Sequence, residues 1–204
     1  MNGTTKVVLV ALAAGALGVV ASLALNRPGP GPLLSTELGQ RALQGALSAT
    51  APAPPEGVAV ARRGAPVPGF SLPALDGATV AVPGAWAGRP VLVNLWASWC
   101  APCIEEMPEL QRYAGEQGAN GTQVVGIALD DEASVRAFLA RVPVEYPILL
   151  DAPGPADAGV RLGNPKGVLP YTALLDGQGR LVKQRVGPFA HGEIDGWARL
   201  EPGH

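Results

Sequence analysis

Residues 91–103, VLVNLWASWCAPC, decide the fold of this chain, because they join an apolar run directly to a Cys-x-x-Cys motif. The run 91–96 predicts a buried strand, and the sequence after Cys103 favours a helix. A helix that begins here places Cys100 at its N-terminus, where unpaired amide groups and the helix dipole stabilise a thiolate. The pair therefore predicts dithiol–disulfide exchange, with Cys100 as the exposed nucleophile and Cys103, one turn later, as the more shielded resolving cysteine.

Cys100 and Cys103 are the only cysteines of the chain, which limits other interpretations of the pair. A structural zinc site needs about four nitrogen or sulfur ligands, yet the two histidines, His191 and His204, stand far along the chain. A permanent structural disulfide over so small a loop would constrain the unfolded chain only slightly. We therefore predict no metal site and no other cofactor, and we expect both histidines on the surface.

The motif continues into Glu106-Met107-Pro108-Glu109-Leu110, and the whole stretch resembles the membrane-anchored, TlpA-like thioredoxins. Every fixed position of that family's signature, W-C-x-P-C-x-x-E-x-P-x-L, is occupied. Residues 64–72 and 75–77 resemble the family's entry segment and hairpin, and residues 167–172 resemble its cis-proline loop. The resemblance covers roughly residues 62–200. It implies an oxidoreductase that acts on cysteines of other proteins, such as apocytochrome c or copper-site proteins, and that receives electrons from a membrane-embedded thiol donor.

Apolar periodicity beyond the motif predicts an α/β domain. Strands are expected at 91–96, 124–129, 147–150, 172–175 and 181–186. Helices are expected at 102–117, 132–141, 156–162 and 191–200. The order fits a thioredoxin-like fold with a mixed central sheet flanked by helices, to which the resemblance adds an N-terminal hairpin and a central strand–helix insertion.

The first 27 residues predict a transmembrane anchor. After Lys6, residues 7–25 contain no charge, and at about 1.5 Å per residue this length is close to a hydrocarbon core of about 30 Å. A cleaved signal peptide, suggested by the small residues at 22–24, is the alternative. Either one exports the rest of the chain, so we expect the inner membrane as location, with the catalytic domain in the periplasm.

Behind the anchor, residues 28–61 predict a Pro/Ala/Gly-rich linker with a short helix at 34–47, followed by a thioredoxin-like domain at 62–204. With 15 basic and 17 acidic residues the formal net charge is −2, and no basic stretch is interleaved with aromatics. Nucleic acid is therefore not an expected partner. A reductant in an oxidising compartment needs electrons from the membrane, and the expected anchor would hold it near that source.

Further site residues come from the resemblance. Pro170 matches the family's cis-proline beside the disulfide, and Leu169 and Tyr171 would flank the groove that receives the partner chain. Trp99 and Pro102 would shape the site rather than react.

Glu106 matches the family's glutamate three residues beyond the second cysteine. It is expected to assist proton transfer or to raise the pKa of the resolving thiol by like-charge repulsion. An ordinary solvated helix residue is the alternative. Asn94 stands where ordinary thioredoxins carry a buried acid, and its neutral amide cannot titrate there.

The direction of electron flow stays open, because reductants and oxidants of this kind share the Cys-x-x-Cys motif while their potentials differ by over ~100 mV. A disulfide-donating oxidant is therefore an alternative. A thiol peroxidase would need Thr or Ser three residues before its reactive cysteine, where Ala97 precedes Cys100. A copper chaperone is a weaker alternative, since two thiolates suit Cu(I) but His191 is the only further candidate ligand.

Overall fold

The computed structural model describes residues 36–118 and 121–200. The expected anchor at 1–27 and His204 lie outside these residues. In the part that is described, no helix combines the length and apolar character needed to cross a bilayer. The described residues divide into two units between Gln40 and Arg41. The helix expected at 34–47 is confirmed as α2 (Glu37–Ala49).

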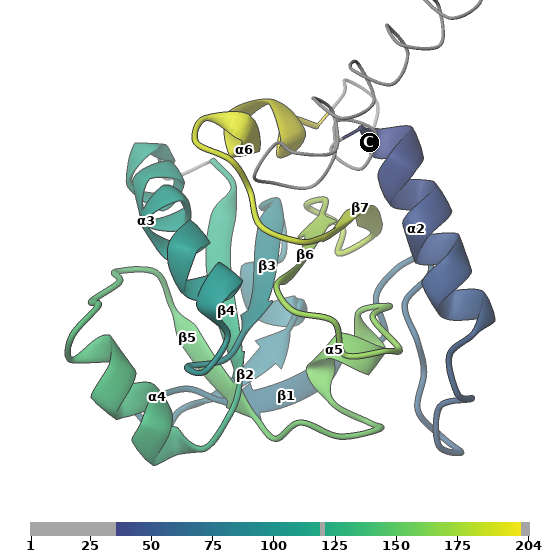
Figure 1. Ribbon diagram of the computed structural model, residues 1–204, viewed down its shortest axis with the longest axis horizontal. Coiled ribbons are helices and arrows are strands. Elements are labelled where there is room, and N and C mark those ends of the chain that lie inside the picture. The colour runs from purple at the N-terminus through teal and green to yellow at the C-terminus, as the bar shows by residue number, and fades with distance from the viewer. Residues whose placement is uncertain (1–35, 119–120, 201–204) are drawn as a thin grey trace, which may run out of the picture. The chain divides into compact units, whose positions relative to one another are not determined.

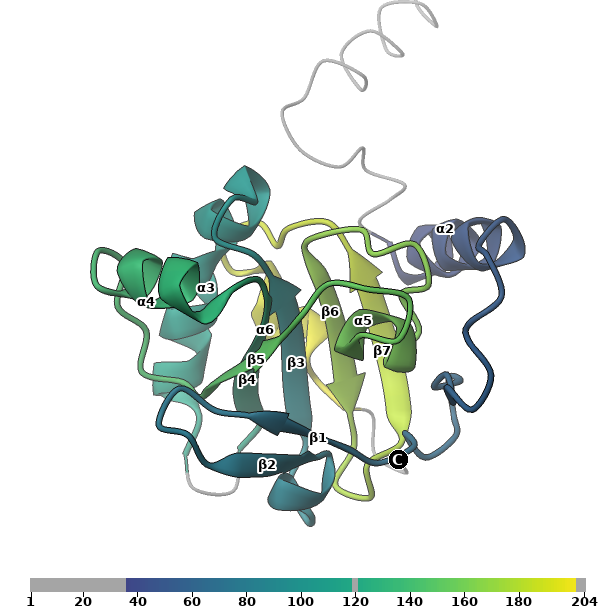
Figure 2. The ribbon, with the colours of Figure 1, turned by 90° about the horizontal axis from the view of Figure 1, so that it is seen from below.

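The second unit is built on a five-stranded mixed sheet with the strand order β5-β4-β3-β6-β7 (Figures 1 and 2). Its strands are β3 (Val91–Trp96), β4 (Gln123–Leu129), β5 (Ile148–Asp151), β6 (Tyr171–Leu175) and β7 (Leu181–Val186). β3, β4 and β5 are parallel, whereas β6 is antiparallel to β3 and β7 is antiparallel to β6. All five expected strands are confirmed, and the mixed sheet with them.

β3 is the middle strand, and all six of its residues are buried. Such burial on both faces requires layers above and below the sheet, and the continuous apolar run at 91–96 is the sequence signature of that position. On one face lie α3 (Ala101–Glu116), α4 (Glu132–Leu139) and α6 (Glu193–Trp197), which share a core with Leu92 and Trp96. The other face shares its core with α5 (Ala158–Arg161) and with the hairpin of β1 (Phe70–Pro73) and β2 (Thr79–Val82).

Three helices are shorter than expected, and one of them, α4, ends at Leu139 rather than 141. α6 begins at Glu193 rather than 191, because Gly192 adopts the left-handed conformation (φ 74°) and interrupts helical geometry there. α5 begins at Ala158 rather than 156, because the Asp157 carboxylate accepts the amide hydrogen of Val160 at 2.9 Å and so caps the helix. Gly163, with φ 92°, follows its end.

Candidate active site

The two cysteines lie where β3 passes into α3 and are joined by a disulfide with a Cα–Cα distance of 5.3 Å. Cys100 is the N-cap of α3, and its carbonyl accepts the amide hydrogens of Cys103 and Ile104. Pro102 occupies the first turn, where a missing amide leaves no hydrogen bond unmade. Cys100 therefore lies at the helix N-terminus, as the sequence predicted, where the helix dipole favours a thiolate.

The expectation that Cys100 is exposed is wrong for the disulfide form. Only 5% of Cys100 and 0% of Cys103 is accessible, because both belong to the apolar cluster between α3 and the sheet. Cys100 is still the more accessible of the two, so the expected order of shielding is confirmed.

Asp130 anchors the turn that carries the cysteines. This residue follows β4, and its Oδ2 accepts hydrogen bonds from the backbone amide and the hydroxyl of Ser98, at 3.0 and 2.5 Å. Sequence reasoning missed this residue. The signal was its place directly after a buried strand that is parallel to β3, since the carboxyl ends of parallel strands meet at one edge of a sheet.

Trp99 and Leu169 come together in a groove of about 300 Å³ beside the turn. Trp99 is 69% exposed, and the groove also contains residues of the loop after β5 and of the loop before β6. Pro102 is exposed but does not line this groove. The Leu169–Pro170 peptide bond is cis, as the resemblance implied.

Tyr171 does not flank the groove, so that prediction is wrong. Its side chain is fully buried on the opposite face of the sheet, where the hydroxyl donates to the Leu162 carbonyl and accepts from the Gln184 side chain, both at 2.8 Å. Side chains alternate between faces along a strand. Because Thr172 faces α3, Tyr171 has to face away from it.

Glu106 is buried rather than solvated, which excludes the ordinary-residue alternative. It is 1% exposed and lies one helical turn beyond Cys103. Its Oε1 accepts a hydrogen bond from Nδ2 of Asn94 at 2.8 Å, and its Oε2 accepts the backbone amide of Phe189 at 3.1 Å. The carboxyl group is therefore fixed between β3 and the segment after β7.

Burial raises the pKa of Glu106 to about 7, against the opposing effects of the Asn94 and Phe189 hydrogen bonds and of the charge of Arg185. A carboxyl group with this pKa is present in both protonation states near neutral pH. It can therefore accept and return a proton there, which is the property that general acid–base chemistry needs.

A polar row crosses the sheet beneath Glu106. Asn94 pairs in register with Thr172, and Thr172 pairs with Arg185. Nδ2 of Asn94 also lies 3.1 Å from the Thr172 hydroxyl oxygen. Sequence reasoning singled out Asn94 but missed the other two. Thr172 interrupts an otherwise apolar strand, whereas Arg185 follows two other polar residues in β7.

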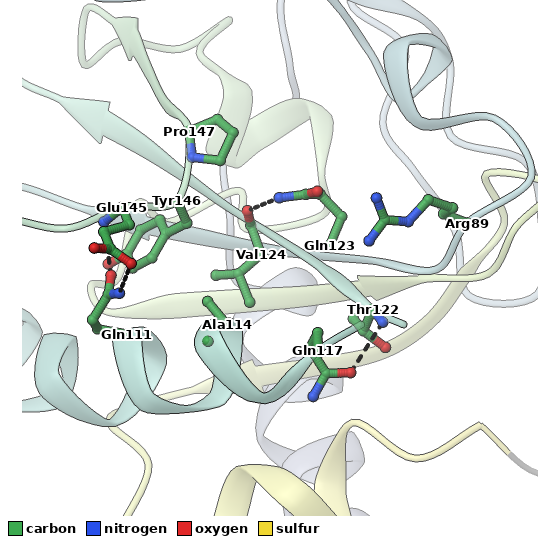
Figure 3. Close-up of a pocket in the computed structure, with 11 residues that line it drawn as sticks. Arg89, Gln111, Ala114, Gln117, Thr122, Gln123, Val124, Glu145, Tyr146 and Pro147 are labelled. Atoms are coloured by element: carbon green, nitrogen blue, oxygen red, sulfur yellow. Dashed lines mark hydrogen bonds between the residues drawn. The ribbon is translucent and has the colours of Figure 1, made fainter. Parts of the chain in front are cut away.

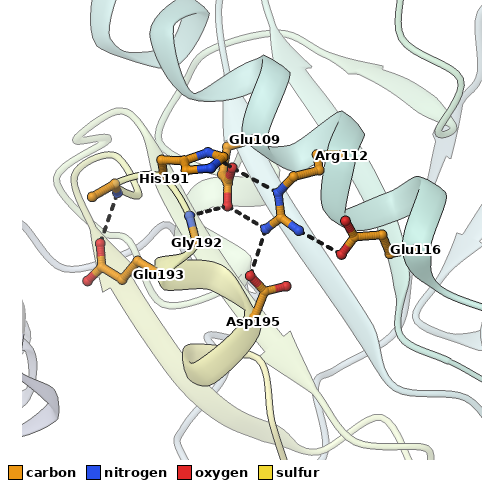
Figure 4. Close-up of polar contacts among 8 residues, drawn as sticks. Glu109, Arg112, Glu116, His191, Gly192, Glu193 and Asp195 are labelled. Atoms are coloured by element: carbon orange, nitrogen blue, oxygen red, sulfur yellow. Dashed lines mark hydrogen bonds and ion pairs between the residues drawn. The ribbon is translucent and has the colours of Figure 1, made fainter.

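A second polar cluster lies further along α3 and is structural (Figure 4). The Glu109 carboxylate accepts from Arg112 on its own helix and from the backbone amide of Gly192. The Arg112 hydrogen bond holds the pKa of Glu109 at about 2, although burial acts the other way. His191 is exposed, as expected, and its Nδ1 lies 3.0 Å from Glu109.

In the part of the chain that the structure describes, neither the pocket in Figure 3 nor the grouping of ionisable side chains indicates a second reaction centre. The pocket of about 150 Å³ in Figure 3 is lined by side chains such as Arg89, Gln111 and Tyr146, and by none of the predicted site residues. Within residues 36–118 and 121–200, no three His, Cys, Asp or Glu side chains are grouped so that they could hold a metal ion.

Comparison with known proteins agrees with this geometry. The sequence model of the Redoxin family matches residues 62–197. The chain is 27% identical to the thiol-disulfide oxidoreductase ResA of Halalkalibacterium halodurans over 69% of this chain and 78% of ResA. It is 34% identical to the thioredoxin-like protein YneN of Bacillus subtilis over 66% of this chain and 77% of YneN. The crystal structure described as a thiol:disulfide interchange protein DsbE from Chlorobium tepidum matches with a TM-score of 0.57 and 29% identity, over 66% of this chain and 92% of that one.

Proposed function

The chain belongs to the Redoxin family and is a thiol-disulfide oxidoreductase, and we propose that its reaction in the cell is the reduction of disulfides in exported proteins. The observation that carries this proposal is the disulfide-bonded pair at the start of α3 with a buried glutamate one turn behind it. The thioredoxin-like resemblance found in the sequence agrees with the family.

In the proposed reaction, the Cys100 thiolate attacks one sulfur of a disulfide in the client protein. A bond forms between Cys100 and that sulfur, the client's disulfide breaks, and the client's second sulfur leaves as a thiolate. The Cys103 thiolate then attacks Cys100, which releases the client as a dithiol and leaves the Cys100–Cys103 disulfide. Two electrons thus pass from the cysteine pair to the client.

Glu106 serves the second step. Cys103 attacks as a thiolate, so its proton has to leave a site from which water is excluded. The carboxylate of Glu106, one turn away, accepts that proton and later returns it when the pair is reduced again. Asn94 and the Phe189 amide hold the carboxyl group in place for this exchange.

The proposal includes the cellular setting that the sequence predicts. Residues 1–27 anchor the chain in the inner membrane, residues 28–61 form the linker, and the domain at 62–204 works in the periplasm. A membrane-embedded thiol protein restores the dithiol, and the clients carry apocytochrome c or copper-site cysteines. A disulfide-donating oxidant is the reverse of this reaction, and the reduction potential separates the two.

Replacing Cys103 by Ser in the full chain tests the reaction. The variant should accumulate mixed disulfides through Cys100, seen as bands on non-reducing gels that disappear with dithiothreitol. The matched variant Cys100→Ser should trap none. A potential near −270 mV would support the reductant, and one near −120 mV would reverse the electron flow. Absence of any trapped client would overturn the mechanism.

A further inference from the structure

Arg185 is completely buried between the sheet and the segment that follows β7. Its guanidinium forms a bidentate ion pair with the Glu193 carboxylate, with nitrogen–oxygen distances of 2.7 and 3.0 Å. It also donates to the carbonyl oxygens of Pro188 at 2.8 Å and Gly187 at 3.3 Å. Its central carbon lies 4.5 Å from the centre of the Phe189 ring. The guanidinium is thus held rigidly by the segment at 187–193.

Two structural features connect Arg185 with Glu106. First, it stands in the cross-strand row with Asn94 and Thr172, on the face that Glu106 covers. Second, it holds Phe189, whose backbone amide donates to Oε2 of Glu106. A nearby positive charge and a donated hydrogen bond both favour the ionised form of a carboxyl group.

If Arg185 only held the segment at 187–193 against the sheet, its positive charge would not be required. Buried ion pairs can often be replaced by apolar side chains without loss of stability, so holding the segment at 187–193 is a weak reason for a buried guanidinium. The side chain of Glu193 is 25% exposed and therefore partly hydrated, whereas Glu106 is only 1% exposed. Water therefore reaches the Glu193 side of this ion pair, whereas the charge of Arg185 acts on Glu106 in a site from which water is excluded.

The other groups that face Glu106 are neutral. Asn94 and Thr172 carry no charge, and burial raises the pKa of Tyr146, so that this phenol stays protonated. Among the described residues, Arg185 is the one whose charge lowers the pKa of Glu106.

We propose that Arg185 is a positioning residue for the thiol chemistry, whose positive charge, beyond its hold on the Phe189 segment, sets how readily Glu106 releases its proton and thereby how readily Cys103 becomes a thiolate. The inference rests on the proposed function, in which Glu106 exchanges a proton with Cys103. Glu193 takes part as the partner that limits the effect of the charge. These two residues extend the site to β7 and α6, beyond the elements that carry the cysteines.

The test is a titration of Glu106 in the full, oxidised chain by ¹³C NMR of its side-chain carboxyl carbon, assigned with Glu106→Gln. Arg185→Met removes the charge and should move the Glu106 titration upward by about one pH unit or more. Glu193→Gln keeps a hydrogen-bonding side chain but no longer compensates Arg185. It should move the titration downward. Arg185→Lys keeps the charge and should give a smaller upward shift than Arg185→Met.

The opposite directions of the two Glu106 titration shifts, upward in Arg185→Met and downward in Glu193→Gln, distinguish the proposal from a purely structural role of Arg185. If Arg185 only holds the segment, both Arg185→Met and Glu193→Gln loosen the Phe189 amide, so two upward shifts would overturn the proposal, as would no shift in either variant. If Arg185→Met fails to fold, the sign of the Glu193→Gln shift still decides.

The proposed function fails separately. Wild-type chain that exchanges no disulfide would overturn that function while leaving the titration readable. Normal exchange with an unmoved titration would overturn only the role of Arg185.

Discussion

Nδ2 of Asn94 lies 2.8 Å from Oε1 of Glu106, so a strand residue six positions before Cys100 holds a helix residue three positions after Cys103. This contact excludes water from the sheet side of the site, because both residues are about 1% exposed. It also explains why a neutral amide stands in β3. The titrating group is supplied by the helix, and the strand supplies the donor that orients it.

Replacing Glu106 by Gln should remove a pH dependence of stability. Burial raises the pKa of Glu106 from 4.5 to about 7, and below pH 4.5 the group is protonated in both the folded and the unfolded chain. As the pH rises toward 7, ionisation favours the unfolded chain, so stability is lost between these values and stays lost above them. The difference of about 2.5 pH units corresponds to on the order of 3 kcal/mol.

Urea unfolding of the oxidised chain near pH 4 and near pH 8 measures this loss. Wild type should lose more stability than Glu106→Gln between the two conditions, by roughly the amount above. Glu105→Gln, at the exposed neighbouring position, is the matched control and should behave like wild type. Equal losses in wild type and Glu106→Gln would show that Glu106 is not the buried titrating group.

Replacing Asn94 by Asp should push ionisation of the site to higher pH. The new carboxyl group would lie against that of Glu106, and two carboxyl groups that share a site cannot both ionise easily. The pH midpoint for alkylation of the reduced Cys103 should then rise by about one unit or more, measured in the background of Cys100→Ser. Asn94→Leu removes the hydrogen bond without adding a carboxyl group and serves as the control. An unchanged alkylation midpoint in Asn94→Asp would show that the Asn94–Glu106 contact does not influence ionisation of the Cys103 thiol.

The sheet was predictable because four of its strands are mainly apolar runs and β7 begins and ends with apolar residues. The ends of all five agree with the expected ends to within one residue. The cysteine turn was predictable for the same reason, since strand, turn and helix follow one another locally. Tyr171 was not, because the residues on both sides of Pro170 could face the groove. Only the pairing of Tyr171 with Leu95 decides which face the side chain takes.

Arg185 shows a second limit of sequence reasoning. An arginine in a strand normally predicts a solvent-facing position. Its burial depends on Glu193, which reaches it only because α6 starts after the left-handed Gly192. Glu106 shows the same limit, because its depth in the site depends on Phe189, 83 positions later in the chain. Partners so distant in sequence leave no local pattern.

Replacing Asp130 by Ala should slow thiol exchange by loosening the turn before Cys100. The variant loses both hydrogen bonds from Ser98, and bonds to a charged group contribute about 1.5–3 kcal/mol each. We expect a lower stability and a rate of peptide-disulfide reduction that falls roughly tenfold, since small displacements at a reacting centre are costly.

Asp131→Ala is the control for Asp130. Asp131 caps α4 by accepting the Ser134 amide hydrogen at 2.9 Å, so its loss should cost about 1 kcal/mol of stability. It makes no contact with Ser98 and should leave the exchange rate unchanged. The role of Asp130 in positioning the turn would be refuted if both variants slowed exchange equally.

Replacing Trp99 by Ala should weaken binding of client chains while leaving the cysteine pair intact. The exposed indole and Leu169 line the same groove, and a buried aromatic contact at an interface is typically worth more than ~1 kcal/mol. The KM for a disulfide-bonded peptide should therefore rise about fivefold or more. The reduction potential should stay near the wild-type value.

Tyr171→Phe is the control for Trp99→Ala, because it removes hydrogen bonds on the far face of the sheet. It should lower the free energy of unfolding by about 1–2 kcal/mol and leave the KM unchanged. A raised KM in Tyr171→Phe, or none in Trp99→Ala, would mean that clients do not bind along this groove.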